Sequence, residues 1–163
     1  MAVQGTGNVV VLNLVDGTVD ATIDISTTTS ETPAGLAVSY DGSTLYVASG
    51  GSIVVVNTAT RAITRVMPAP VTVSTASLRL STQNPAAQTL FTVNPGSRNL
   101  IALTPADATV LGTKGVGSGA SPFAVSDDGA YAFALNALDA SVSRVDLNSL
   151  DAPTPVTSIS TAH

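Results

Sequence analysis

The fold is decided by residues 32–57, TPAGLAVSYDGSTLYVASGGSIVVVN. Large residues alternate with small ones up to Asp41-Gly42, which is typical of a strand with one packed face. An Asp-Gly pair between two alternating segments is a strong hairpin signal, because glycine accepts a positive φ angle without steric cost. The chain turns again at Gly50-Gly51, and Ile53–Val56 predicts a third strand. The stretch therefore predicts an antiparallel meander.

The meander recurs along the chain. GNVVVLN at 7–13 aligns without a gap on GSIVVVN at 51–57, and AVS-x-DG returns at 124–129. A four-stranded unit that repeats every 40–45 residues or so is typical of propeller blades. A β-sandwich also explains alternation, but it does not explain a motif that returns at a fixed place. We expect an all-β chain with one β-propeller region over 1–163: a partial blade at 1–26 and blades at 33–67, 72–114 and 121–160.

Composition and charge narrow the possible functions. Only 10% of the residues are charged, and the formal net charge is −5. The six basic residues are scattered, whereas nucleic-acid binding depends on clustered cations. The chain contains no cysteine and no apolar run of about 18 residues that could span a bilayer. A threonine- and serine-rich surface with few lysines favours an exported or cell-surface protein.

The segments 37–49 (AVSYDGSTLYVAS) and 52–63 (SIVVVNTATRAI) resemble the YVTN family of β-propeller repeats. That family carries an A-V-S-x-D-G hairpin, an L-Y-V-T-N-like second strand and a V-x-V-I-D/N-T-A-T third strand. Ala48-Ser49 departs from it, because the family often has Thr-Asn there. The resemblance is strong over 33–66 and 122–136 and weaker elsewhere. It implies an interaction module like those of bacterial and archaeal surface proteins, although lactonase-type propeller enzymes carry similar repeats.

The sequence offers few candidates for catalysis or metal binding. His163 is the single histidine and the last residue, which is a poor place for a catalytic imidazole. Asp127-Asp128-Gly129 lacks the further oxygen ligands of a calcium loop and matches the Asp41-Gly42 hairpin instead. Asn13, Asn57 and Asp146 end third strands, where such side chains cap turns. We therefore expect no catalytic, cofactor-binding or metal-binding residue, and no bound cofactor.

Two further features have a functional and a structural interpretation. The glycine-rich segment 112–119 (GTKGVGSG) contains Lys114 but lacks the phosphate-binding pattern GxxxxGK[ST], so we interpret it as a flexible connection between blades. Tyr46, Phe91 and Phe133 occupy equivalent second-strand positions and could form a carbohydrate platform. Packing between neighbouring sheets is the more general reason for aromatic residues spaced by one blade, and we predict it for all three.

The predicted function is a non-catalytic interaction or scaffold module that binds a protein or a surface polymer. Loops on a rigid scaffold are the usual binding elements. We expect two loop sets on one face, namely the links 26–35, 67–76 and 112–121 and the turns 49–52, 94–99 and 136–140. The alternatives are a lactonase-like hydrolase with carboxylates around a central channel, disfavoured because Glu31 is the single glutamate, and a structural repeat without a ligand.

The repeat alignment also makes a prediction about closure. It places Met1 on Leu45, so the first blade would lack its innermost strand, and fifteen strands are expected in all. An arc of this size would expose sheet faces and an open edge. We expect it to form part of a seven- or eight-bladed ring, with a second copy as one way to complete it. A self-closed four-bladed ring is the alternative.

Overall fold

β-Strands, joined by turns, are the only regular secondary structure in the residues that the structure describes. The computed structural model describes residues 2–3, 6–29, 32–69, 78–81, 88–94, 96–126, 128–149 and 157–160. No helix occurs in these ranges, and hence none that is long and apolar enough to cross a membrane. The predicted all-β fold is confirmed.

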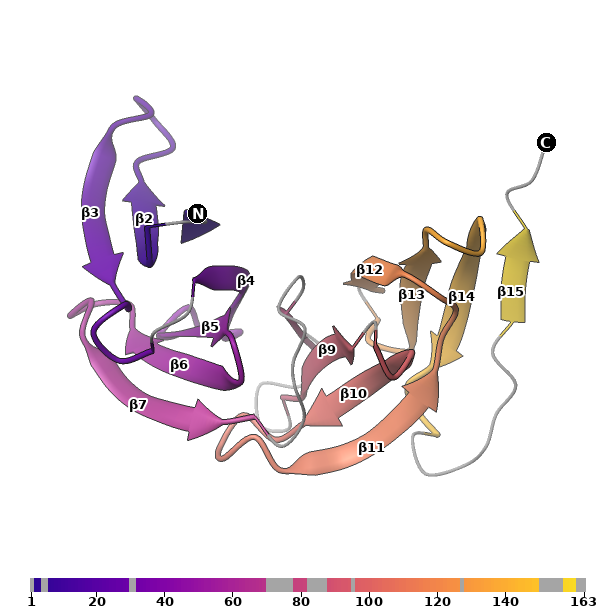
Figure 1. The fold of residues 1–163 in the computed structure, drawn as a ribbon. Coiled ribbons are helices and arrows are strands. Elements are labelled where there is room, and N and C mark those ends of the chain that lie inside the picture. The colour runs from indigo at the N-terminus through magenta and orange to yellow at the C-terminus, as the bar shows by residue number, and fades with distance from the viewer. Residues whose placement is uncertain are drawn as a thin grey trace.

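Fifteen described strands form four antiparallel meanders, here called sheets I to IV (Figure 1). Sheet I contains β1 (Ala2–Val3), β2 (Asn8–Leu12) and β3 (Val19–Asp24). Sheet II contains β4 (Pro33–Val38), β5 (Thr44–Ser49), β6 (Ser52–Asn57) and β7 (Ile63–Pro68). Sheet III contains β8 (Leu78–Leu80), β9 (Leu90–Asn94), β10 (Asn99–Leu103) and β11 (Val110–Gly115). Sheet IV contains β12 (Ala120–Val125), β13 (Tyr131–Asn136), β14 (Ser141–Asp146) and β15 (Thr157–Ser160).

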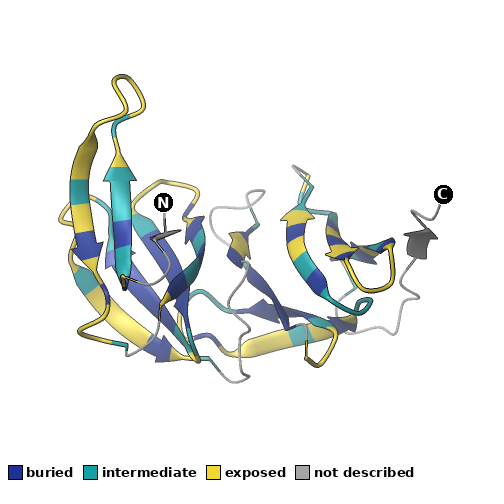
Figure 2. Cartoon of the chain, turned by 45° about the horizontal axis from the view of Figure 1, so that its top comes forward, coloured by how far each residue is buried: buried dark blue, intermediate teal, exposed yellow. Residues whose placement is uncertain are grey.

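The sheets follow one another along an open arc, with sheet I at one end and sheet IV at the other (Figure 1). Neighbouring sheets pack face to face, and the outermost strands β3, β7 and β11 are largely exposed (Figure 2). The predicted antiparallel meanders are therefore present, whereas the arc does not close on itself in this structure.

The Asp-Gly hairpins form as predicted. Gly42 and Gly129 have φ angles of 73° and 65°, in the left-handed region. In sheet II, the Ser39 hydroxyl donates to the Asp41 carboxylate over 2.6 Å and accepts the Thr44 amide over 2.9 Å. Ser126 makes the same two contacts, with Asp128 and Tyr131, in sheet IV. A short polar side chain thus closes the turn wherever this motif occurs.

The turns between third and fourth strands share a second geometry. Gly17, Arg61 and Ala108 each adopt a positive φ angle four residues after the start of their turn. The pairing register shifts beside each turn, as it does when a bulge follows a tight turn. The Asn13 and Asn57 side chains accept backbone amides from within their turns, and Asp146 accepts the Asn148 amide, so the predicted capping is confirmed.

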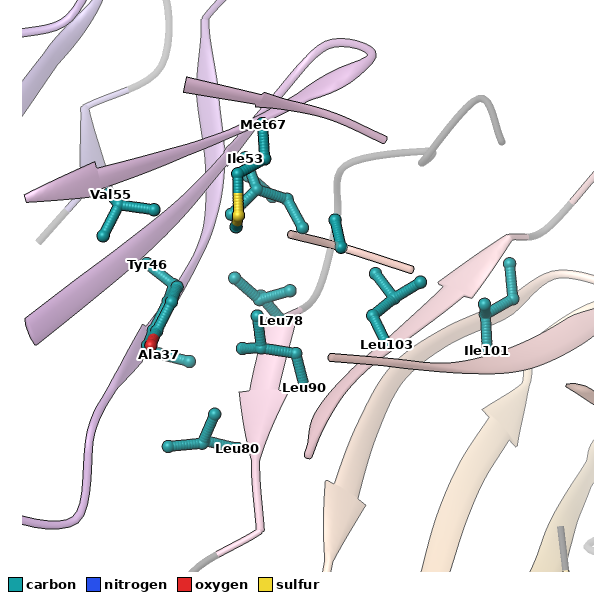
Figure 3. Close-up of a cluster of buried hydrophobic side chains, with 12 residues drawn as sticks. Ala37, Tyr46, Ile53, Val55, Met67, Leu78, Leu80, Leu90, Ile101 and Leu103 are labelled. Atoms are coloured by element: carbon teal, nitrogen blue, oxygen red, sulfur yellow. The ribbon is translucent and has the colours of Figure 1, made fainter. Parts of the chain in front are cut away.

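Three apolar cores lie between the four sheets, one at each junction. At the centre of the arc, Tyr46 and Met67 of sheet II pack with Leu78, Leu90 and Leu103 of sheet III (Figure 3). Phe91 belongs to the core between sheets III and IV. Burial of such aliphatic and aromatic surface is the main stabilising contribution to the fold.

The structure corrects three sequence predictions. The gapless alignment places Ala2 on Tyr46 and Val11 on Val55, and Tyr46 pairs with Val55, so it predicts that Ala2 pairs with Val11. Ala2 pairs instead with Val9, because the turn before β2 is two residues longer than Gly50-Gly51. Strand β11 runs to Gly115, so half of the segment 112–119 is paired backbone and not a flexible connection.

The third correction concerns the aromatic residues. Tyr46 and Phe91 pack between sheets as predicted, whereas 37% of Phe133 is exposed. Phe133 lies on the face of sheet IV that points away from sheet III, where the described residues place no further sheet. The sequence analysis placed Phe133 correctly in the second strand of sheet IV, but no further sheet among the described residues covers its side chain.

Candidate functional site

The predicted loop face exists, and its loops are bonded to one another. The Thr29 and Ser49 hydroxyls lie 2.9 Å apart, which joins the first link to the β5–β6 turn. The Ser118 amide donates to the Asp139 carboxylate over 2.5 Å, which joins the third link to the β13–β14 turn. The described parts of these links and turns therefore share one end of the sheets. Residues 30–31, 70–76 and 95 of the predicted loops lie outside the described residues.

A buried amide fixes the third link. Asn136 is fully buried and accepts the Gly117 amide over 3.0 Å. Its own NH₂ group donates to the hydroxyls of Ser141 and Ser143, at 3.0 and 2.8 Å. A Cβ atom at Gly117 would lie 2.5 Å from the Asn136 Cγ, so glycine is required there. Because both amide donors are used internally, Asn136 positions the loop.

Five aspartate side chains accept hydrogen bonds within or beside turns. Asp16, Asp24, Asp41, Asp107 and Asp128 each accept hydrogen bonds from residues within three positions in the chain. These bonds favour the ionised form, so the pKa of each carboxyl lies below its ordinary value; for Asp41, the Ser39 hydroxyl is the largest cause. No cluster of three metal-ligating side chains occurs among the described residues. Glu31, Asp127 and His163 lie outside them.

Lys114 is held inside the molecule. Its residue is only 5% exposed, and it lies in β11 directly opposite Leu100, a member of the core between sheets III and IV. A phosphate-binding lysine must reach a ligand from a glycine-rich loop that precedes a helix, and Lys114 instead lies within a paired strand. The position of Lys114 therefore argues against a phosphate site in the segment 112–119, whose first half is paired strand.

An apolar groove, which the sequence analysis did not identify, opens between sheets I and II. Its volume is about 440 Å³, and its lining is mostly aliphatic: Val11, Leu14, Leu36, Val38, Leu45 and Val56 contribute, together with Thr58 and Arg61. The Arg61 guanidinium donates to the Asp20 carbonyl oxygen over 3.3 Å and so links the two sheets beside the groove. A cleft of this size and composition is typical of a binding site.

Exposed apolar side chains occur in the groove lining and close to it in the chain. Leu14 is 96% exposed at the β2–β3 turn, and Val38 and Tyr40 are also exposed at the β4–β5 hairpin. Leu14, Thr58 and Arg61 belong to the turns at the end of the sheets opposite the links. A signal was present in the sequence, because Leu14-Val15 are large apolar residues in a turn where polar residues are expected.

The comparisons with known proteins identify the fold alone. No family model and no curated protein matches the chain. Among solved structures, it is similar to a protein of unknown function from Desulfotomaculum acetoxidans DSM 771, with a TM-score of 0.73 and 12% identity over 99% of this chain and 52% of that one. It is also similar to a chain of the mitotic checkpoint complex, with a TM-score of 0.66 and 24% identity over 96% of this chain and 45% of that one.

A third similar structure is hydrazine synthase of Kuenenia stuttgartiensis, with a TM-score of 0.60 and 20% identity over 80% of this chain and 36% of that one. The folds matched are of the propeller type, so the chain has a propeller-type fold. The chain spans between about a third and a half of the length of these structures.

Proposed function

We propose that this chain is a non-catalytic, YVTN-like propeller module that binds an apolar segment of a partner protein in the groove between sheets I and II. In this proposal the arc is part of a ring of seven or eight sheets. The observation that carries the function is the aliphatic groove of about 440 Å³, in whose lining Leu14 and Val38 are exposed. Exposed apolar surface gathered at a cleft marks an interaction site.

The lining favours a protein over a surface polymer. Polysaccharides are held by exposed aromatic rings and by polar groups, and the groove is lined mainly by valine and leucine side chains. Of the three aromatic residues that could have formed a platform, Tyr46 and Phe91 are buried in the cores, and Phe133 is exposed in sheet IV but is not part of the groove. Aliphatic side chains of a peptide would gain free energy from burial here, at about 25 cal/mol for each Å² of apolar surface. Thr58 and Arg61 would fix its orientation.

Selection from a phage-displayed random peptide library tests the proposal. We expect aliphatic-rich peptides to be enriched on the immobilised chain, and their binding, measured by fluorescence anisotropy, to fall at least about tenfold in Val38→Asp because a charge would enter the groove. Val110→Asp is the matched control, since Val110 is similarly exposed in β11 and is not part of the groove. Peptides that bind parent and Val38→Asp equally well would contradict the proposal.

A further inference from the structure

The two ends of the arc expose sheet faces that repeat the faces buried inside it. In sheet IV, Phe133 pairs with Arg144 and Leu135 pairs with Val142. The corresponding pairs are Tyr46–Val55 and Ala48–Ile53 in sheet II, and Phe91–Ala102 and Val93–Leu100 in sheet III. All eight of those residues are buried against the following sheet. We call Phe133, Leu135, Val142 and Arg144 the terminal face of sheet IV.

Sheet I exposes the complementary side of the same junction. Val10, Leu12 and Val19 occupy the positions that Val54, Val56 and Ile63 hold in sheet II, with the same pairing register. In sheet II these three side chains pack against the preceding sheet. Val10, Leu12 and Val19 form the terminal face of sheet I, and Leu12 and Val19 are exposed there.

We propose that the terminal face of sheet IV packs against the terminal face of sheet I of a second copy of this chain, so that two copies close one ring. The three junctions inside the chain show what covers such a face, namely the opposite face of another such sheet. The two terminal faces lie at opposite ends of the arc (Figure 1), so each copy offers one face of each kind. Val10 and Leu12 also line the groove, whereas Val19 does not, so the test below changes Val19 and leaves the groove lining intact.

The number of copies in the proposal is taken from the length of a similar structure. This chain covers 52% of the Desulfotomaculum acetoxidans protein while 99% of the chain itself is matched. Two arcs of this length therefore correspond to one complete chain of that protein. A heterologous contact that repeats around an axis forms a closed ring when its rotation closes, and an open filament when it does not.

The charged side chains on the two terminal faces are also compatible with this packing. Arg144 occupies the position of Val55 and Ala102, and its guanidinium lies 4.9 Å from the centre of the Tyr131 ring. Residues 1–60 contain no lysine or arginine, and Asp24 of β3 is exposed on the outer side of sheet I. Sheet I of the second copy would therefore bring acidic and not basic side chains near Arg144. An acidic neighbour lowers the desolvation free energy of burying the guanidinium.

Light scattering coupled to size exclusion tests the proposal with one variant on each face. The parent chain should elute with twice its mass of 16.2 kDa, and Leu135→Asp and Val19→Asp should each shift the mass towards 16.2 kDa. The matched controls are Leu138→Asp and Val15→Asp, which lie in adjoining turns, are 81% and 96% exposed, and should leave the mass unchanged. Circular dichroism of every variant confirms that the strands are formed.

Mixing the two variants separates this arrangement from a symmetric one. Leu135→Asp retains an intact sheet I face, and Val19→Asp retains an intact sheet IV face. In the mixture these two intact faces can pack together, so heterodimers should form with one unaltered junction. If sheet IV packed against sheet IV, Val19→Asp alone would remain dimeric and the mixture would recover nothing. A monomeric parent at micromolar concentration, a symmetric dimer, or a ladder of larger species would each overturn the proposal.

Discussion

Sheets II and IV share a motif and differ in what surrounds it. Both carry AVS-x-DG, a closed Asp-Gly turn and an aromatic residue at the same position of the second strand. Tyr46 of sheet II is 7% exposed, whereas Phe133 of sheet IV is 37% exposed. The comparison shows that the local sequence fixes the strand and the turn, while the neighbouring sheet decides whether the face is core or surface.

The largest expected difference lies in the aromatic positions. Phe91→Ala should destabilise the fold by about 3–5 kcal/mol, because it leaves a cavity between sheets III and IV. Phe133→Ala should lower the free energy of unfolding by about 1 kcal/mol or less in dilute protein, because its side chain is already partly in water. Urea unfolding, at a protein concentration low enough for light scattering to show a monomer, measures both values.

Phe91→Leu provides a milder variant should Phe91→Ala fail to fold, and its effect should still exceed that of Phe133→Leu. Equal losses at the two positions would contradict the conclusion that neighbouring sheets, and not strand position, determine burial.

A moderate and equal effect is expected at the two Asp-Gly turns. Gly42→Val and Gly129→Val should each destabilise by more than about 1 kcal/mol, because a β-branched residue is strained at positive φ. The two losses should agree, since the turn geometry does not depend on the neighbouring sheet. Gly51→Val is the control: an added Cβ meets no atom within 4 Å at Gly42 or at Gly51, and Gly51 does not have a positive φ angle. A parent-like melting temperature for Gly42→Val would show that the backbone is not strained there.

The smallest expected effect is the pH dependence of the same turns. Because hydrogen bonds, first of all from Ser39 and Ser126, lower the pKa of Asp41 and Asp128 in the folded chain, their carboxylates stabilise it above the pKa of the unfolded state. That contribution is lost as the pH falls through the lowered folded pKa. The melting temperatures of Asp41→Asn and Asp128→Asn should therefore lie below that of the parent at pH 7 and approach it below about pH 4. A difference that stays constant from pH 7 to pH 3 would assign the effect to shape and not to charge.

The sequence by itself determined the strands, the two kinds of turn and the repeat. These features depend on contacts within about five residues, such as the Ser39–Asp41–Thr44 turn and the Asn57 cap. It also placed the links and the second-strand turns at one end, because the direction of an antiparallel meander follows from its strand order. The family label and the blade boundaries remain predictions from the same patterns.

Only the tertiary structure decided which faces are covered. Phe133 and Tyr46 are indistinguishable by strand position, and the free end of sheet IV, not the local sequence, exposes the former. The register of Ala2 with Val9 depends on a turn whose length the repeat alignment did not reveal. The apolar groove lies between two sheets whose lining residues are up to about fifty positions apart, so the Leu14-Val15 pair reveals an apolar turn in the sequence but not the groove beside it. Burial of a side chain depends on whether a neighbouring sheet packs against it, and the local sequence of a strand does not specify that neighbour.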